Sequence, residues 1–162
     1  MNAIPPNAPA TASNAVQPPP GELPPGLSPA LHAFKAQVAA GSADQVFPGS
    51  QFRGGLPPHV LRRVREHIQT NLGSTLTLRD LATTAGLSAS HFGRAFKQSE
   101  GMTPRKYLLK CRLRQAVQLL AGTQLALSEI AFASGFAAQS HFSRQFRKYV
   151  GITPSRYRWF TR

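Results

Sequence analysis

The sequence predicts an all-α fold of about seven helices, in which a long helix joins two similar units. Three observations indicate this fold. Apolar residues recur at helical spacing from Leu56 onward, no run alternates between apolar and polar residues as a strand does, and part of the chain occurs twice. Residues 91–107 repeat as 141–157 at an offset of 50 (141 − 91), with His, Phe, Arg, Gly, Thr, Pro and Tyr at matching positions. Such a repeat indicates one supersecondary unit used twice.

The chain begins with an arm rich in Pro and Ala, and we assign residues 1–55 as arm and linker. Residues 1 to about 27 are dominated by Pro, Ala and Asn. We expect this part to be disordered, because it cannot bury enough apolar surface to offset the entropy of ordering. Ser28-Pro29 predicts a short helix at about 29–40. It is either a docking helix or a transient helix in a linker, and we prefer the linker because so short a helix is marginal alone.

The first unit contains three helices. Pro57-Pro58 opens the first of them. Thr77 and Asp80 form a capping-box pattern at the start of a short second helix. After a turn at Gly86, Ser88 caps the third helix.

The long helix and the second unit follow. Thr103-Pro104 starts a linker helix over about 104–121, and Thr153-Pro154 starts a last short helix. The upstream helices of the two units match at an offset of 49 rather than 50, so the second turn is one residue longer. A short helix, a turn with Gly and a second helix form the helix-turn-helix pattern, whose second helix enters the DNA major groove. We therefore expect a domain over 56–162, with helix-turn-helix motifs at about 77–99 and 128–149.

The net charge of +13 lies entirely from Leu56 onward, where seventeen Lys and Arg face four acids (17 − 4 = +13). Such a density attracts a polyanion. One cysteine, Cys111, excludes an internal disulfide, and no apolar run approaches the roughly 18 residues of a membrane span. No Lys or Arg precedes Lys35, which argues against a secretory signal. These features predict a cytoplasmic protein with no membrane partner.

The sequence offers no site for catalysis, a cofactor or a metal. The six carboxylates are scattered, and we find no phosphate-binding loop, no nucleophile elbow and no Cys/His cluster at zinc spacing. Cys111 fits a core position better than a nucleophile or a redox switch. We therefore predict that the protein is not an enzyme.

The second helix of each motif presents a polar stripe centred on an arginine. With Phe92 and Phe142 facing the core, a rotation of about 100° per residue places Arg94 and Arg144 on the outer face. An arginine discriminates guanine by roughly 1–3 kcal/mol through two hydrogen bonds. The alternative is that these arginines lie on an ordinary solvated helix face. An arginine at the equivalent position of both copies favours DNA binding over that alternative. The residues predicted to face the bases are Ser90, Gly93, Arg94, Gln139, Ser140, Ser143 and Arg144.

A second set is predicted to contact the DNA backbone, which positions a protein without specifying sequence. For His91 and His141 we prefer packing or phosphate contact over base readout. The basic residues of the linker helix either line phosphates or keep an exposed face soluble. Gly93 either permits close approach to DNA or marks a position that is not read. The set comprises Lys97, Thr77, Ser88, His91, Arg105, Lys106, Ser128, His141, Arg147 and Lys148.

The linker helix has the length of a spacer between grooves. Its 18 residues span roughly 27 Å at 1.5 Å per residue. Successive major-groove faces lie about 34 to 36 Å apart. With side-chain reach added, both recognition helices fit one face of a duplex.

Residues 56–160 resemble the DNA-binding domain of AraC/XylS-type transcriptional regulators. The resemblance implies two helix-turn-helix subdomains that bind an asymmetric double-stranded promoter site as a monomeric module, with activation through RNA polymerase. It also implies base-facing positions at Ser90, Gly93 and Arg94 and at Ser140, Ser143 and Arg144. It rests on Leu81-Ala82, Gly86, Ser88, Phe92, Arg94, Phe96-Lys97, Gly101-Met102-Thr103-Pro104 and Tyr107, and on Ile130-Ala131, Gly135-Phe136, Ser140, Phe142, Arg144, Phe146, Gly151-Ile152-Thr153-Pro154 and Tyr157.

The first 55 residues depart from the family pattern. Many members carry a separate effector-sensing domain, and this segment is too short and too rich in Pro to be one. Either the chain is a single-domain regulator controlled by its abundance, or it is the DNA-binding part of a regulator whose sensing function lies in another chain. A non-specific nucleoid-type DNA-binding protein is the alternative function.

Overall fold

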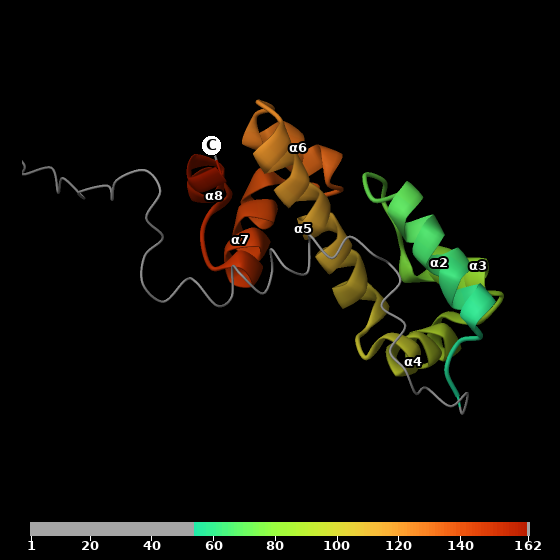
Figure 1. Cartoon of the computed structure of the whole chain (residues 1–162). Helices are drawn as coiled ribbons and strands as arrows, with labels where there is room; N and C mark the ends of the chain where they lie inside the picture. The colour runs from blue at the N-terminus through green and yellow to red at the C-terminus, as the bar shows by residue number, and fades with distance from the viewer. Residues whose placement is uncertain (1–53, 162) are drawn as a thin grey trace, which may run out of the picture.

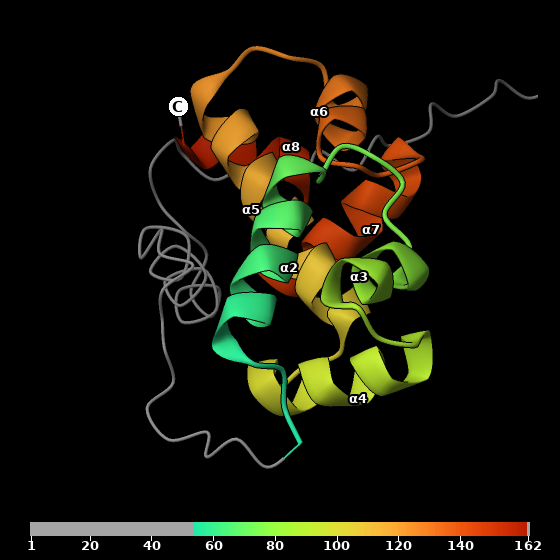
Figure 2. The ribbon, with the colours of Figure 1, turned by 90° about the vertical axis from the view of Figure 1, so that its right-hand side faces the viewer.

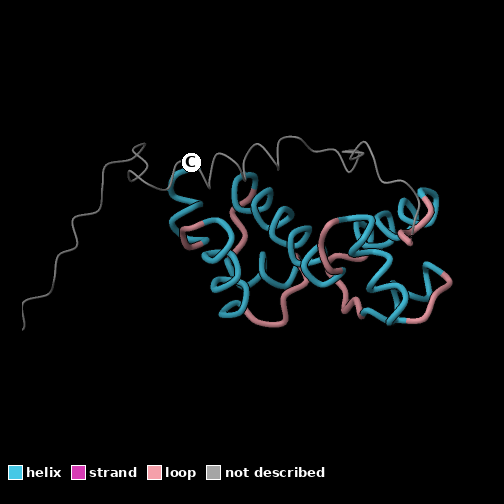
Figure 3. The backbone as a smooth tube through the Cα atoms, turned by 90° about the horizontal axis from the view of Figure 1, so that it is seen from below, coloured by secondary structure: helices cyan, strands magenta, loops and turns pink. Residues whose placement is uncertain are grey.

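The computed structural model describes residues 54–161, and this part of the chain contains helices and loops but no strand (Figure 3). The predicted all-α class with two helix-turn-helix units is confirmed. The expected disordered arm at 1–27 and short helix at 29–40 lie outside the described residues. The helices are α2 (Pro58–Thr70), α3 (Leu78–Ala85), α4 (Ala89–Glu100), α5 (Pro104–Gly122), α6 (Leu127–Ala133), α7 (Gln139–Val150) and α8 (Pro154–Thr161).

Two separate cores lie at the two ends of α5 (Figure 1). In the first unit, α2, α3 and α4 pack around Phe92 and Phe96, and the first half of α5 adds Leu108 and Cys111. In the second unit, α6, α7 and α8 pack against the last half of α5 around a second Phe pair. Burying one such side chain contributes roughly 1.5–3 kcal/mol. The long helix therefore belongs to both cores and connects them directly. In the rotated view, α2 of the first unit lies in front of α5 (Figure 2).

Local capping signals fix where the helices begin. Thr77 and Asp80 form the predicted capping box, in which the Asp80 N–H donates to Thr77 Oγ1 (3.2 Å) and the Thr77 N–H donates to Asp80 Oδ2 (2.8 Å). The carboxylate accepts hydrogen bonds from the Thr77 N–H and from the Thr77 hydroxyl (2.7 Å), and these lower the pKa of Asp80. At the start of α6, the Ala126 N–H donates to Glu129 Oε2 (2.6 Å), and the methyl side chain of Ala126 cannot accept a hydrogen bond in return. The second copy thus keeps half of the capping arrangement.

The linker helix α5 has 19 residues, one more than expected, and spans about 28 Å. The turn between α6 and α7 covers 134–138 and is two residues longer than the turn at 86–88, whereas the change in offset predicts one. The extra residue arises because α6 ends at Ala133, one position earlier in the repeat than α3, which ends at Ala85. None of the described helices has the length and apolar character needed to cross a membrane.

Candidate nucleic-acid interface

The two recognition helices, α4 and α7, are buried in the same way. Each places two Phe rings in its core at 0% exposure, and a Tyr from the next helix packs edge-on against the second ring. Burial raises the pKa of Tyr107 to about 12 and also raises the pKa of Tyr157, so both phenols stay neutral near pH 7. The equivalent residues are Phe92 and Phe142, Phe96 and Phe146, and Tyr107 and Tyr157.

This anchoring turns equivalent polar residues outward. In α4, Ser90, Arg94 and Lys97 are exposed and Gly93 is half-buried. In α7, Ser143 is half-buried at the position equivalent to Gly93. The remaining predicted residues of α7 are exposed, and these are Gln139, Ser140, His141, Arg144, Arg147 and Lys148.

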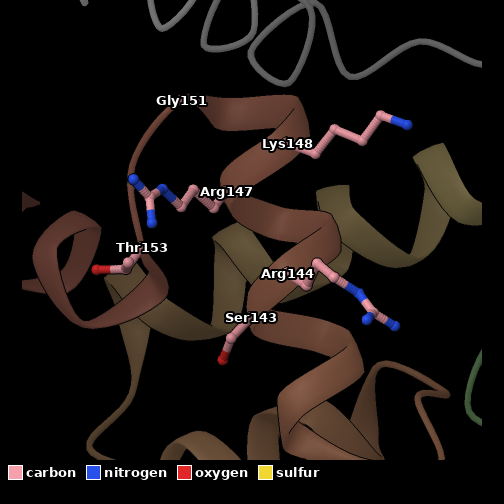
Figure 4. Close-up of a pocket in the computed structure, with 6 residues that line it drawn as sticks. All are labelled: Ser143, Arg144, Arg147, Lys148, Gly151 and Thr153. Carbon is pink, nitrogen blue, oxygen red and sulfur yellow. The ribbon is translucent and has the colours of Figure 1, made fainter.

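A shallow basic pocket lies along α7 and the connection to α8 (Figure 4). The side chains of Ser143 and Arg147 point to the side where Thr153 lies, whereas those of Arg144 and Lys148 extend to the other side. Predicted base-facing and backbone residues therefore meet here. Sequence reasoning missed two lining residues, Gly151 and Thr153. A signal for Thr153 existed, because it caps α8 directly after a helix rich in basic residues.

A larger groove lies between the two units. It is lined by the outer face of α4, the start of α5 and the turn before α7. Its predicted members are Thr77, Ser90, Gly93, Arg94, Lys97, Arg105 and His141. The lining residues that were not predicted are Leu76, Leu78, Leu81, Ala89, Thr103, Pro104, Leu108, Leu109, Arg112, Phe136 and Gln145. The apolar residues among them gave no signal for a binding site, because an apolar residue at helical spacing predicts only a core position. Arg112 was predicted only as one of the basic residues of the linker helix, and Thr103 only as a helix start.

The histidine of α7 is held by packing. The His141 ring stands edge-on to the Phe136 ring, with centroids 5.7 Å apart. The interpretation of the exposed His141 as a packing or phosphate residue stays a prediction. The predicted residues that line neither the pocket nor the groove are Ser88, His91, Lys106, Ser128, Gln139 and Ser140. Among them, Ser128 lies half-buried on α6, and Ser88 accepts a hydrogen bond from the His91 N–H (3.3 Å) as the cap of α4.

The acidic residues of the described chain are engaged away from both hollows. Glu100 is 8% exposed and accepts hydrogen bonds from Arg65 at 2.6 Å. Asp80 and Glu129 cap helices, and Glu66 lies 3.9 Å from Arg62. None of these acids lines the pocket or the groove. The basic side chains there keep a positive field, which attracts a polyanion.

No group of three or more His, Cys, Asp or Glu side chains within residues 54–161 is arranged to hold a metal ion. The basic and hydroxyl side chains that line the pocket and the groove support hydrogen bonding and charge pairing with a polyanion. Arginine and serine supply the hydrogen-bond donors on both helices.

Comparison with known proteins decides the family. Residues 81–159 match a family model described as a helix-turn-helix domain. A transcriptional regulator from Chromobacterium violaceum, described as having an AraC-type DNA-binding domain, is 35% identical with a TM-score of 0.58, over 62% of this chain and 89% of that chain. The chain belongs to the AraC-type helix-turn-helix family. The resemblance predicted from the sequence is confirmed.

Further relatives place this AraC-type domain among transcription regulators. The probable transcriptional regulator LumQ of Photobacterium leiognathi is 38% identical over 99 residues, which cover 61% of this chain and 40% of LumQ. The DNA-binding domain of AdpA, solved with a target DNA, has a TM-score of 0.59 at 28% identity, over 60% of this chain and 88% of that chain. The AraC-type chain spans less than half the length of the curated relatives it matches.

Proposed function

We propose that this protein is a bacterial transcription regulator that binds double-stranded DNA sequence-specifically through α4 and α7 in successive major grooves. One observation carries the proposal. Two helices with closely similar burial patterns present arginine-centred stripes at equivalent positions, and no carboxylate of residues 54–161 lines the hollows beside them. The likeness to the AdpA domain, which was solved with its target DNA, supports it.

Arg144 is the main base reader in this proposal. It lies at the centre of the exposed arc of α7, between Ser140 and Lys148. Arg94 takes the same place on α4, where Gly93 leaves the neighbouring position without a side chain. The second copy thus has more groups that contact base edges, and the first contributes more through backbone contacts such as Lys97. Phosphate contacts set register, and base contacts set sequence.

Membership of the AraC-type family supports a more detailed proposal about how the protein regulates transcription. The domain binds an asymmetric promoter site as a monomer at the nucleoid and activates transcription by contact with RNA polymerase.

A non-specific nucleoid protein is the second candidate, and the net charge of +13 favours it. Charge-only binding collapses as the salt concentration rises and shows little sequence preference. Base readout instead leaves a specificity ratio of roughly 10³ or more. Selection from random duplexes separates the two candidates. We expect an asymmetric motif with two boxes about one helical turn apart, and a flat sequence distribution would contradict the proposal.

Two substitutions test the assignment of residues. Arg144→Ala should relax one position of the selected motif, at a cost of roughly 1–3 kcal/mol against the preferred base. Lys97→Ala should weaken binding to all sequences alike and lower the salt slope by about one. Both effects follow from affinities measured at several salt concentrations on matched and mismatched duplexes. If Arg144→Ala behaves like Lys97→Ala, the base-reading assignment is wrong.

A further inference from the structure

The two units approach each other beside the linker helix. Arg112, on α5, donates from Nε to the carbonyl oxygen of Leu72 (3.3 Å) and from Nη2 to the carbonyl oxygen of Ser74 (2.9 Å). Both acceptors belong to the loop between α2 and α3, in the first unit. Arg112 is half-buried, and partial desolvation lowers its pKa. Its hydrogen bonds thus hold a loop of the first unit against the linker.

The turn between α6 and α7, in the second unit, packs against the same loop between α2 and α3. A Cβ added at Gly135 would collide with the carbonyl oxygen of Leu72 and would lie 2.7 Å from Arg112 Nε. A Cβ added at Gly73 would lie 3.3 Å from the carbonyl oxygen of Ala133. The backbones of the two units therefore meet face to face around the arginine.

The internal repeat shows that this contact is not a requirement of the helix-turn-helix fold. Gly86 is the equivalent of Gly135 in the first unit (135 − 86 = 49). Both have left-handed backbone conformations, with φ of +70° and +79°. A Cβ at Gly86 would meet nothing within 4 Å. The turn needs glycine in both copies for its conformation. In the second copy, the space beside the glycine is also occupied by the Leu72 carbonyl of the first unit and by Arg112.

The two units have separate cores, so α5 and this junction determine their relative orientation. One base pair between two DNA boxes rotates the second box by roughly 35° and moves it by roughly 3.4 Å, since a turn of 34–36 Å holds about 10 base pairs. If the orientation of the two units is fixed, a change in box spacing places one recognition helix out of register with its box, and binding weakens. If the junction is loosened, the units can reorient and both recognition helices can still reach their boxes.

We propose that Arg112 is a positioning residue that, through the Leu72–Ser74 loop and Gly135, fixes the spacing between the two DNA boxes that the protein accepts. The proposal rests on the proposed function, because it presumes two recognition helices on one duplex. It assigns to Arg112 a role in spacing specificity, distinct from contact with a base or a phosphate.

The experiment measures binding to the selected two-box duplex and to duplexes with one base pair inserted or deleted between the boxes. Arg112→Met removes the donors but keeps an unbranched apolar side chain. For the unmodified protein we expect a spacing change to weaken binding by about tenfold or more, which is of the order of one mismatched base pair. For Arg112→Met we expect that penalty to fall below about threefold, with the salt slope unchanged, since no phosphate contact is lost.

Arg114→Met is the matched control. It removes the same charge from the same helix, but two positions along a helix turn the side chain by about 200°. It should keep the full spacing penalty. Thermal unfolding of each variant confirms that the compared proteins are folded.

A pair of glycine variants tests the other side of the junction. Gly86→Ala and Gly135→Ala impose the same left-handed backbone strain, and only Gly135→Ala displaces the Leu72 loop. Only Gly135→Ala should reduce the spacing penalty. If Gly135→Ala does not fold, Arg112→Met carries the test alone.

Two results would overturn the proposal. Arg112→Met could retain the spacing penalty of the unmodified protein, or it could weaken all spacings equally while lowering the salt slope, which would make Arg112 a phosphate contact. An unmodified protein that selects no motif would instead remove the proposed function itself, so the two failures are distinguishable.

Discussion

Gly93 and Ser143 occupy equivalent positions on the two recognition helices, and both are half-buried. A helical wheel anchored on the buried Phe residues placed both residues on the polar side of their helices, because helix periodicity can be determined from the local sequence. It gave no information on what surrounds Gly93. The structure supplies it, since a Cβ at Gly93 would meet nothing within 4 Å. No packing constraint within the described protein therefore requires glycine there.

Gly93→Ala should raise the free energy of unfolding by about 0.5–1 kcal/mol, because glycine in a helix interior costs about that much relative to alanine. Chemical denaturation measures the change. Ser143→Ala is the control and should give a smaller gain. A fall in stability would contradict the prediction. The affinity of Gly93→Ala for the selected duplex then decides between the two interpretations, because weaker binding indicates close approach to DNA and equal binding indicates a position that is not read.

At the scale of elements, capping residues made most helix ends predictable. Thr77 and Thr103 mark helix starts that the structure reproduces. Contacts between helices were not predictable, since no periodicity pairs residues that lie far apart in the sequence. Arg65 of α2 and Glu100 of α4 form a partly buried ion pair across 35 positions, in which the Glu100 side chain is the buried partner. In the second unit, Val150 occupies the position equivalent to Glu100 (150 − 100 = 50). The same buried position is therefore filled by an ion-paired carboxylate in the first unit and by an apolar side chain in the second.

Arg65→Ala should destabilise the protein by about 3 kcal/mol or more, because it leaves the buried Glu100 carboxylate without its main partner. The control is Arg62→Ala on the same helix. Arg62 lies 3.9 Å from Glu66 with both side chains mostly exposed, so its loss should cost less than about 1 kcal/mol. Denaturant unfolding measures both. Equal effects of the two substitutions would show that the buried pair does not hold α2 on α4.

The double substitution Arg65→Leu with Glu100→Val separates charge from packing. It copies the apolar solution of the second unit at the Glu100 position. Since exchanging a buried ion pair for apolar residues is often neutral or stabilising, we expect the double variant to be more stable than Arg65→Ala. A double variant as unstable as Arg65→Ala would show that the site requires the pair itself.

At the scale of the whole molecule, the arrangement of two units on one linker could be predicted, but their relative orientation could not. The length of α5 follows from its local sequence. The orientation depends on backbone carbonyls of Leu72 and Ser74, which lie 40 and 38 residues from Arg112 and leave no side-chain pattern. The same limit applies to the candidate site, where exposed stripes were predictable and the groove between the units was not.

The distribution of charge leads to a prediction about the whole chain. The two cores are built from residues 56–157, and the Leu56 N–H donates to Ser99 Oγ (2.8 Å). Residues 1–53 carry two basic and two acidic side chains, which cancel. A protein cut to residues 54–162 should therefore unfold cooperatively. It should bind the selected duplex within about threefold of the full chain at every salt concentration, because the salt slope counts the phosphates neutralised. Affinities of both proteins between 50 and 200 mM salt, roughly the range in which such contacts are lost, measure this. A lower slope for the shorter protein would place DNA contacts within residues 1–53, and a loss of cooperative unfolding would place part of a core there.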